Sequence, residues 1–302
     1  MTYPTAAPLA RSGAATATAA VAASALLGAA PLSAQVHQAA APQHAPLAAT
    51  PGVHRAAVAF APVPFSVGEE LVFKATFGRV TAGTARMRVE GVESVRGRPA
   101  YHVVFTVDGG IPFFRVHDRY ESWIDVETLA SLRHSQRITE GRYHRTTTYE
   151  IFPERAQYTK NGGAPQPSVS HPLDDGSFIY AVRAAGIRVG ETRRDERYFR
   201  PDRNPVVLRG LRRDTVEVDA GTFATTVVRP SIKTSGLFAE DGDAQVWFTD
   251  DARRYPVLVR TKFSRFSLTL TLQSLTPGEG VVASSLPRAA AVLDTAVDAH
   301  HP

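Results

Sequence analysis

Residues 71–77 read Leu-Val-Phe-Lys-Ala-Thr-Phe, with apolar side chains at every second position. The same period of two recurs in residues 85–90, Ala-Arg-Met-Arg-Val-Glu, and in residues 268–273, Leu-Thr-Leu-Thr-Leu-Gln. Successive side chains of a strand point to opposite faces, so this pattern is typical of sheets with one apolar and one polar face. The sequence therefore predicts an all-β fold that is mostly antiparallel.

Turn residues divide the chain into many strands. We expect strands at residues 70–78, 81–92, 100–107, 114–125, 131–139, 143–152, 155–160, 192–199, 206–211, 215–218, 224–233, 244–249, 257–263 and 266–275. An Asp N-cap at Asp174 and a closing Gly186 predict one short helix near 175–185. So many strands joined by short turns favour a meander that curls into a barrel-like or strongly curved sheet. A sandwich of two packed sheets is the alternative.

The two ends of the chain differ from the middle. Residues 1–34 carry one charge, Arg11, followed by an Ala-rich run and a small residue, Ala34, which is the pattern of a secretory signal peptide. An uncleaved anchor and a plain Ala-rich leader are the alternatives. Residues 35–63 and 276–302 read as a flexible tether and a flexible tail. The expected single β domain spans residues 64–275.

Composition limits the classes of function. The chain has no cysteine, which excludes disulfides, thiol nucleophiles, Cys-based metal sites and an N-terminal lipid-modified cysteine. The formal charge is +5, but the densest basic stretch is interleaved with acids, and we expect no nucleic-acid partner. We find no standard catalytic or cofactor motif, so no catalytic residue, cofactor or metal site is predicted. The pattern favours a periplasmic or envelope protein without a transmembrane span once the signal is removed, and leaves the oligomeric state open.

The best polar constellation lies on the strand expected at residues 114–125 and on its neighbour. One face carries Arg115, His117, Arg119 and Glu121, and the next strand adds Arg133 and Arg137. If the strands pair with these faces on one side, the six residues form a basic patch for a lipid headgroup or another anionic envelope component. The alternative is a solvated sheet face with cross-strand charge pairs. The histidines His102, His117, His134 and His144 lack the spacing of metal ligands.

Several short motifs, taken in order, resemble one family. They are Gly68-Glu69-Glu70-Leu71, Thr81-Ala82-Gly83-Thr84-Ala85, Asp118-Arg119-Tyr120-Glu121-Ser122, Ala220-Gly221-Thr222-Phe223, Val246-Trp247-Phe248-Thr249-Asp250-Asp251 and Arg254-Tyr255-Pro256-Val257. Their order and spacing over residues 65–275 resemble the bacterial exported family called domain of unknown function 3108. The resemblance implies export, an all-β fold and an envelope location, and it brings no catalytic residue. The section 188–213 does not align with the family.

Three functions fit these observations. The first is a non-catalytic envelope protein whose curved sheet holds a lipid or other amphiphile, with Phe73, Phe77, Phe105 and Trp247 lining a cavity. The second is a hydrolase or lyase acting on envelope polymer through His117, Arg119 and Glu121. The third is a structural protein without a ligand.

Overall fold

The computed structural model describes residues 63–111, 114–233, 243–263 and 266–279. The expected signal peptide, nearly all of the tether and most of the tail lie outside the described residues. Within these ranges, no helix is long and apolar enough to cross a membrane.

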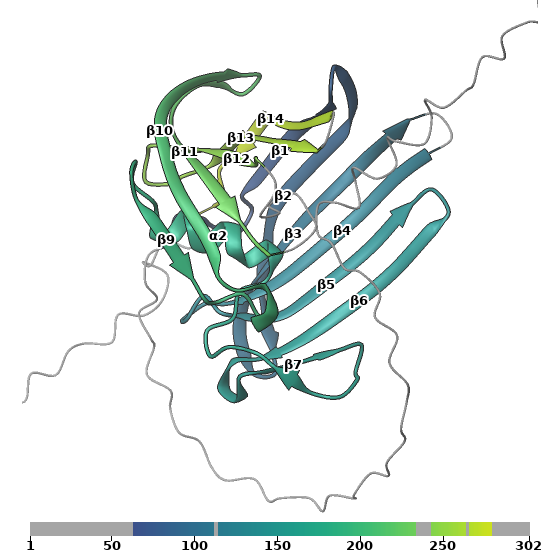
Figure 1. Cartoon of the computed structure of the whole chain (residues 1–302). Helices are drawn as coiled ribbons and strands as arrows, with labels where there is room; N and C mark the ends of the chain where they lie inside the picture. Colours follow the sequence, from purple (N-terminus) through teal and green to yellow (C-terminus); the bar gives the residue numbers. More distant parts are fainter. Residues whose placement is uncertain (1–62, 112–113, 234–242, 264–265, 280–302) are drawn as a thin grey trace, which may run out of the picture.

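The described chain is built from strands around one α-helix (Figure 1). The strands are β1 (Glu70–Phe77), β2 (Val80–Val95), β3 (Arg98–Ile111), β4 (Phe114–Asp125), β5 (Ser131–Glu140), β6 (Tyr143–Phe152), β7 (Gln157–Lys160), β8 (Gln166–Pro167), β9 (Thr192–Asp195), β10 (Val206–Val218), β11 (Gly221–Ser231), β12 (Gln245–Thr249), β13 (Pro256–Phe263) and β14 (Phe266–Thr276). The helices are α2 (Asp175–Ala185) and the short 3₁₀ turns η1 (Pro153–Arg155) and η2 (Pro201–Arg203).

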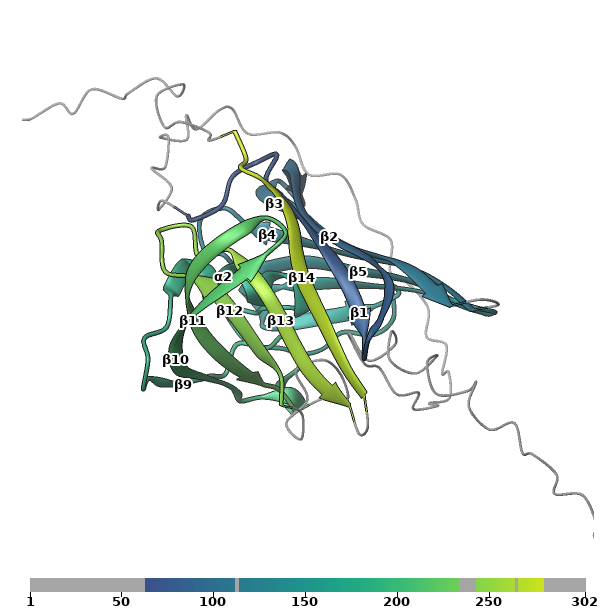
Figure 2. The ribbon, with the colours of Figure 1, turned by 90° about the horizontal axis from the view of Figure 1, so that it is seen from above.

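All fourteen strands that the structure describes belong to one antiparallel sheet, which confirms the all-β prediction. The order is β8-β7-β6-β5-β4-β3-β2-β1-β14-β13-β12-β11-β10-β9. Consecutive strands therefore pair with each other except β8 and β9, and β1 also pairs with β14. The sheet curls strongly, and its two halves face each other across α2 (Figure 2). Because β8 and β9 are edge strands, the sheet is not closed into a barrel. Because the hydrogen-bonded ladder is continuous, it is not a sandwich of two separate sheets.

Several predicted boundaries were wrong. Residues 206–211 and 215–218 belong to one long strand, β10, which continues through a register shift between Gly210 and Arg212. Strand β7 begins only at Gln157 because Pro153–Arg155 forms η1, and β9 ends at Asp195 rather than at residue 199. The two-residue strand β8 has no periodicity and was not predicted. In the turn between β5 and β6, Gly141 has the left-handed conformation at φ 58°.

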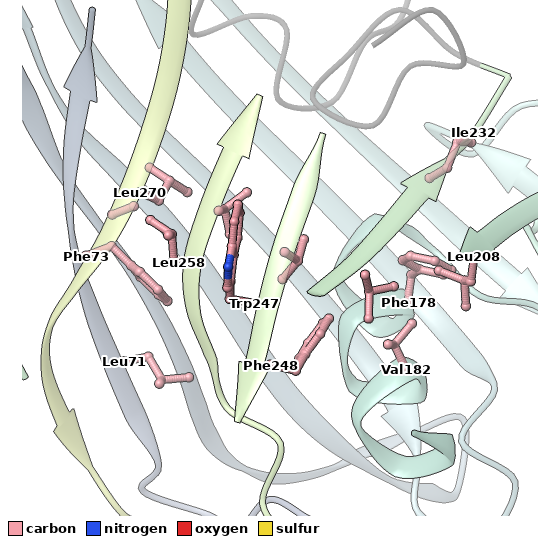
Figure 3. Close-up of a cluster of buried hydrophobic side chains, with 14 of the residues drawn as sticks. Leu71, Phe73, Phe178, Val182, Leu208, Ile232, Trp247, Phe248, Leu258 and Leu270 are labelled. Carbon is pink, nitrogen blue, oxygen red and sulfur yellow. The ribbon is translucent and has the colours of Figure 1, made fainter. Parts of the chain in front are cut away.

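The helix α2 lies inside the curve of the sheet and is covered by β10 and β11 (Figures 1 and 2). Its predicted ends are confirmed, since Asp174 caps the backbone N–H groups of Gly176 and Ser177, and Gly186 ends the helix. Phe178 and Val182 join the main apolar cluster with residues from both halves of the sheet (Figure 3). The helix therefore fills most of the space inside the curved sheet, and no wide cavity remains there.

A buried ion pair fixes α2 to the start of the sheet. Arg183 donates to both carboxylate oxygens of Glu69, at 2.6 and 3.0 Å, and also to the carbonyl oxygen of Pro64 at 2.9 Å. Both charged side chains are buried, and the guanidinium lies 5.1 Å from the ring centre of Tyr255. A buried charge is tolerated only when it is paired and hydrogen-bonded, which this arrangement provides.

Candidate functional site

An apolar pocket remains beside α2 inside the curved sheet. This interior pocket has a volume of about 80 Å³ and is partly open. Its walls come from β2, β3, β4, β12, β13, β14 and the first turns of the helix. The lining residues are Met87, Val103, Val104, Phe105, Tyr120, Ser122, Asp175, Gly176, Ile179, Tyr180, Val246, Pro256, Val259 and Leu270. The wall is thus apolar except at Ser122 and Asp175, which lie together at the N-terminal end of α2.

The four aromatic residues expected to line a cavity have different positions. Phe105 is in the wall of the interior pocket. Phe73 and Trp247 are instead packed in the main apolar cluster, as Figure 3 shows. Phe77 is half-buried near the end of β1. Two of the four residues expected to line the cavity therefore belong to the packed core.

Behind the polar end of the pocket lies a buried group of side chains, here called the polar cluster: Ser122, His134, Gln136, Asp174, Asp175 and Tyr198. The Ser122 hydroxyl donates to Asp174 Oδ1 at 2.6 Å, and the same oxygen accepts the N–H groups of Gly176 and Ser177. His134 is fully buried and stacks on Tyr149. Strand β4, strand β5 and the cap of α2 thus meet at one point.

The tautomer of His134 follows from its partners. Its Nδ1 lies 2.9 Å from the carbonyl oxygen of Glu121 and must donate there. Its Nε2 accepts from the side-chain amide of Gln136 at 3.0 Å. A Ser–His–Asp relay needs a histidine nitrogen free to take the serine proton. In this structure the Ser122 hydroxyl lies 3.3 Å from His134 Nδ1, but that nitrogen donates to Glu121 and the hydroxyl donates to Asp174, so the cluster is not arranged as such a relay.

The other end of the polar cluster reaches Arg203, which is also buried. The Tyr198 hydroxyl donates to Asp175 Oδ1 at 2.7 Å, and Arg203 Nη1 donates to that hydroxyl oxygen at 3.0 Å. Burial raises the pKa of the Asp175 carboxyl, and His134 and Arg203 partly offset this effect. Burial and the neighbouring Asp175 raise the pKa of Tyr198 well above its usual value.

The cluster has more acceptors than donors. Asp174 Oδ2 and Gln136 Oε1 are buried atoms without a hydrogen-bond partner among the described residues. Buried polar atoms in native proteins are nearly always paired, so each exception calls for a missing donor such as a water, an ion or a ligand group.

The six residues predicted as a ligand-binding patch lie on the face of β4 and β5 that is turned away from the core. The register places Arg119 opposite Arg137, and Arg133 opposite Trp123, so the two strands do present these side chains on one side. Arg115, His117 and Arg137 are exposed. The structure therefore brings the patch together, and ligand binding by it stays a prediction.

Acidic side chains are more numerous on this face than the sequence suggested. His117 is bonded to Asp108. Glu121 accepts from Arg119 at 3.0 Å and lies 3.1 Å from His102 Nε2.

Arg133 is held in the same way, since its Nε donates to Glu150 at 2.6 Å. Four of the six residues thus have carboxylate or imidazole partners, which reduces the field that the patch presents to an anion.

No group of three or more His, Asp or Glu side chains in the part of the chain that the structure describes is placed to hold a metal ion. His102 stacks on Trp123 at 4.4 Å, His117 and His144 are exposed, and His134 belongs to the polar cluster. The two acids Asp250 and Asp251 belong to the turn between β12 and β13. There Asp251 Oδ1 accepts from the backbone N–H groups of residues 253 and 254.

Sequence reasoning missed the polar cluster although one signal was available. On β4 the even-numbered positions face the core, and Asp118 and Ser122 occupy that apolar phase. Asp174 was interpreted only as a helix-capping residue, and Asp175 only as the start of the helix. A polar side chain in the apolar phase of a strand indicates a buried polar site, but its partners on β5 and α2 cannot be found from spacing alone.

The family model "Protein of unknown function (DUF3108)" matches residues 72–273. No curated protein matches the sequence.

Three solved structures share features of the fold. The first is a β-barrel-like protein of domain of unknown function 1849 from Brucella abortus, with 10% identity, 72% of this chain and 100% of that chain covered, and a TM-score of 0.47. The second is a predicted lipoprotein from Parabacteroides distasonis, with 10% identity, 71% and 98% covered, and a TM-score of 0.33. The third is a predicted exported protein with a YmcC-like fold from Bacteroides fragilis, with 11% identity, 72% and 100% covered, and a TM-score of 0.29. At these TM-scores the arrangements differ, so the likenesses assign no function to this chain.

Proposed function

This chain belongs to the DUF3108 family, which has no assigned function, and we propose that it is an exported envelope protein that binds an amphiphile without catalysing a reaction. The interior pocket is the observation that carries this proposal. Its wall is apolar and enclosed by the sheet and α2, and its polar atoms are confined to one end. Sites for small apolar ligands have this composition, with a few polar groups that fix orientation.

The size of the interior pocket limits what it holds. Its volume of about 80 Å³ is roughly half that of a ~150 Å³ cavity that accepts benzene. The pocket therefore accommodates the end of an acyl chain or a few carbons, with the rest of the molecule leaving through the open side. Met87 in the wall is unbranched and adaptable, which allows some expansion.

An enzyme acting through His117, Arg119 and Glu121 has less support. His117 is bonded to Asp108 on an exposed sheet face, and Glu121 is shared between His102 and Arg119. These residues do not line the interior pocket. Under the carrier proposal, His117→Ala leaves ligand binding unchanged.

Native mass spectrometry of protein purified from its own host tests the proposal. We expect a co-purifying amphiphile that is lost in Ile179→Phe, because the larger ring fills the interior pocket from α2. Val216→Phe is the matched control, since Val216 packs against the core but does not line the pocket. An empty native protein, or equal loading of both variants, would contradict the proposal.

Export is tested separately. The Ala-rich start and the small residue Ala34 motivate it. N-terminal sequencing of the native protein from the envelope fraction should give a mature chain that starts near Gln35. A cytosolic chain that still begins at Met1 would refute it.

A further inference from the structure

A second pocket lies at the C-terminal end of α2, whereas the interior pocket borders the first turns of that helix. It is here called the arginine pocket, because Arg188, Arg213 and Arg254 all line it. Its volume of about 370 Å³ falls within the range of small-molecule sites, roughly 300–1,000 Å³. No described residue lines both pockets, so the arginine pocket is a separate site.

One side of the arginine pocket is apolar. Val182 of α2 and Phe248 of β12 belong to the main apolar cluster, as Figure 3 shows, and Val228 of β11 lies with them in the wall. Ile187 and Val189, in the loop after the helix, complete this side, and Val189 is 47% exposed. Contact with this side removes apolar surface from water, which favours a ligand with an apolar part.

The loop after α2 is fixed against β10. A Cβ at Gly210 would be 2.1 Å from the carbonyl oxygen of Arg188, so only glycine allows this close approach. The N–H of Gly190 donates to the carbonyl oxygen of Gly210 at 2.8 Å. The backbone of Arg188 is therefore held at the edge of the pocket, while its side chain is 94% exposed and accessible to a ligand.

Arg254 is held in position from two sides. Its Nη1 donates to the carbonyl oxygen of Arg183 at 2.9 Å, and a Cβ at Gly186 would be 3.0 Å from its Nε. Its backbone is left-handed at φ 47°, which is uncommon for a residue other than glycine, and its N–H donates to Asp251 at 3.0 Å. The guanidinium is thus placed over the end of the helix before any ligand binds.

The other two arginines are not neutralised by nearby acids. Arg213 has no carboxylate partner in the part of the chain that the structure describes. Arg188 lies 3.9 Å from Glu191, but that carboxylate is bound more closely by Arg193, at 2.5 Å. Both side chains therefore remain available to an external anion.

The charges in the wall define the anion. Asp250 is the one carboxylate among the described residues of the wall, and its Oδ1 accepts the Thr226 hydroxyl at 2.5 Å. Three guanidinium groups and one carboxylate leave an excess of two positive charges. Guanidinium groups bind phosphate and carboxylate oxygens through paired N–H donors. A phosphate monoester carries a charge of about −1.5 to −2 at pH 7, so it balances this excess better than a carboxylate does.

We propose that the arginine pocket binds a phosphate monoester with an apolar substituent. The phosphate lies against the three arginines, and the substituent lies on the apolar side of the pocket. This site goes beyond the proposed function, which concerns the interior pocket.

The test compares hexyl phosphate, hexanoate and inorganic phosphate, each titrated at pH 7 into the mature native protein and followed by calorimetry. We expect hexyl phosphate to bind about tenfold more tightly than inorganic phosphate, because burial of a few methylene groups accounts for such a factor. It should also bind more tightly than hexanoate, and its binding should weaken as salt rises. Equal binding of inorganic phosphate, tighter binding of hexanoate, or no binding of hexyl phosphate overturns the proposal.

Variants locate the bound phosphate. Arg188→Ser/Arg213→Ser should weaken hexyl phosphate binding by about tenfold or more, because it removes charge-assisted hydrogen bonds. Arg194→Ser/Arg209→Ser is the matched control, since it removes the same charge from exposed arginines of β9 and β10 that do not line the pocket. An equal loss in both variants, or no loss in the first, contradicts the proposal.

A third variant separates the two pockets. Ile179→Phe fills the interior pocket, so hexyl phosphate binding should be unchanged in it. Loss of binding in Ile179→Phe would place the ligand in the interior pocket, which overturns this inference and agrees with the proposed function. A native protein that carries no amphiphile contradicts the proposed function alone.

Discussion

Replacing Asp118 by asparagine should remove a pH dependence that this carboxyl imposes on folding. Asp118 is fully buried on the core-facing side of β4 and accepts the backbone N–H of Thr139 at 2.9 Å. Burial raises its pKa from 3.8 to about 6, and the nearby Glu140 adds to the rise. The hydrogen bonds from Thr139 and Tyr120 oppose it without cancelling it.

The magnitude follows from the shift. A difference of about 2 pKa units corresponds to roughly 3 kcal/mol, at about 1.4 kcal/mol for each unit. The folded state holds the proton more tightly than the unfolded state, so this group favours folding most below about pH 4. That contribution decreases as the pH rises and is lost above about pH 6. An asparagine keeps an oxygen for the N–H of Thr139 and carries no charge at any pH.

Urea unfolding at a series of pH values from 4 to 7.5 measures this effect. We expect Asp118→Asn to match the parent chain near pH 4 and to exceed its free energy of unfolding by up to about 3 kcal/mol at pH 7. Asp219→Asn serves as the control, since that carboxylate is exposed. The reasoning is refuted if the difference between Asp118→Asn and the parent does not grow with pH, or if the variant is the less stable chain at pH 7.

Three further predictions concern other parts of the molecule. Arg183→Met should reduce the free energy of unfolding by roughly 3–5 kcal/mol, because it leaves Glu69 as a buried unpaired charge. A loss below 1 kcal/mol in urea unfolding would contradict that account. Ser177→Ala should reduce the free energy of unfolding by about 1 kcal/mol, because the Ser177 hydroxyl accepts the N–H of Asp174 in the capping box. Thermal melting at pH 7 measures this loss. The doubly substituted Arg115→Ser/Arg137→Ser chain should bind anionic vesicles less than the parent at low salt, and binding by the parent should be lost as salt rises. If both chains sediment equally with the vesicles, the predicted patch binds no anion and is only a solvated sheet face.

The bounds of a strand or helix were predicted correctly where the apolar pattern and its turn or capping residues lie close together in the sequence. The bounds of β4, β6 and α2 agree with the expected ranges because alternation, turn residues and a capping box lie within a few residues of each other. Strand β10 was divided in two because Arg212, Arg213 and Asp214 interrupt the apolar pattern. Arg212 and Arg213 are exposed and follow the register shift after Gly210, so no apolar alternation joins the two parts of the strand.

The candidate site depended on contacts that no local pattern contains. The predicted patch residues occupy one face of two neighbouring strands, which alternation and register can place. The polar cluster joins Ser122, His134 and Asp174 from three elements, and the last of them is 52 residues from the first. Each of these residues has an ordinary local explanation, as a strand or capping residue. The β4–β5 register alone places Ser122 opposite His134, and the packing of α2 inside the curved sheet adds Asp174.

The pairing of β1 with β14 has a consequence for how the chain reaches its fold. Leu71 pairs with Leu275, so the first strand gains its second neighbour only when the last strand is present. Contacts between residues so distant in sequence require closure of a very long loop and slow the folding of a domain. During synthesis, β1 therefore keeps one edge unpaired until nearly the whole sheet has emerged.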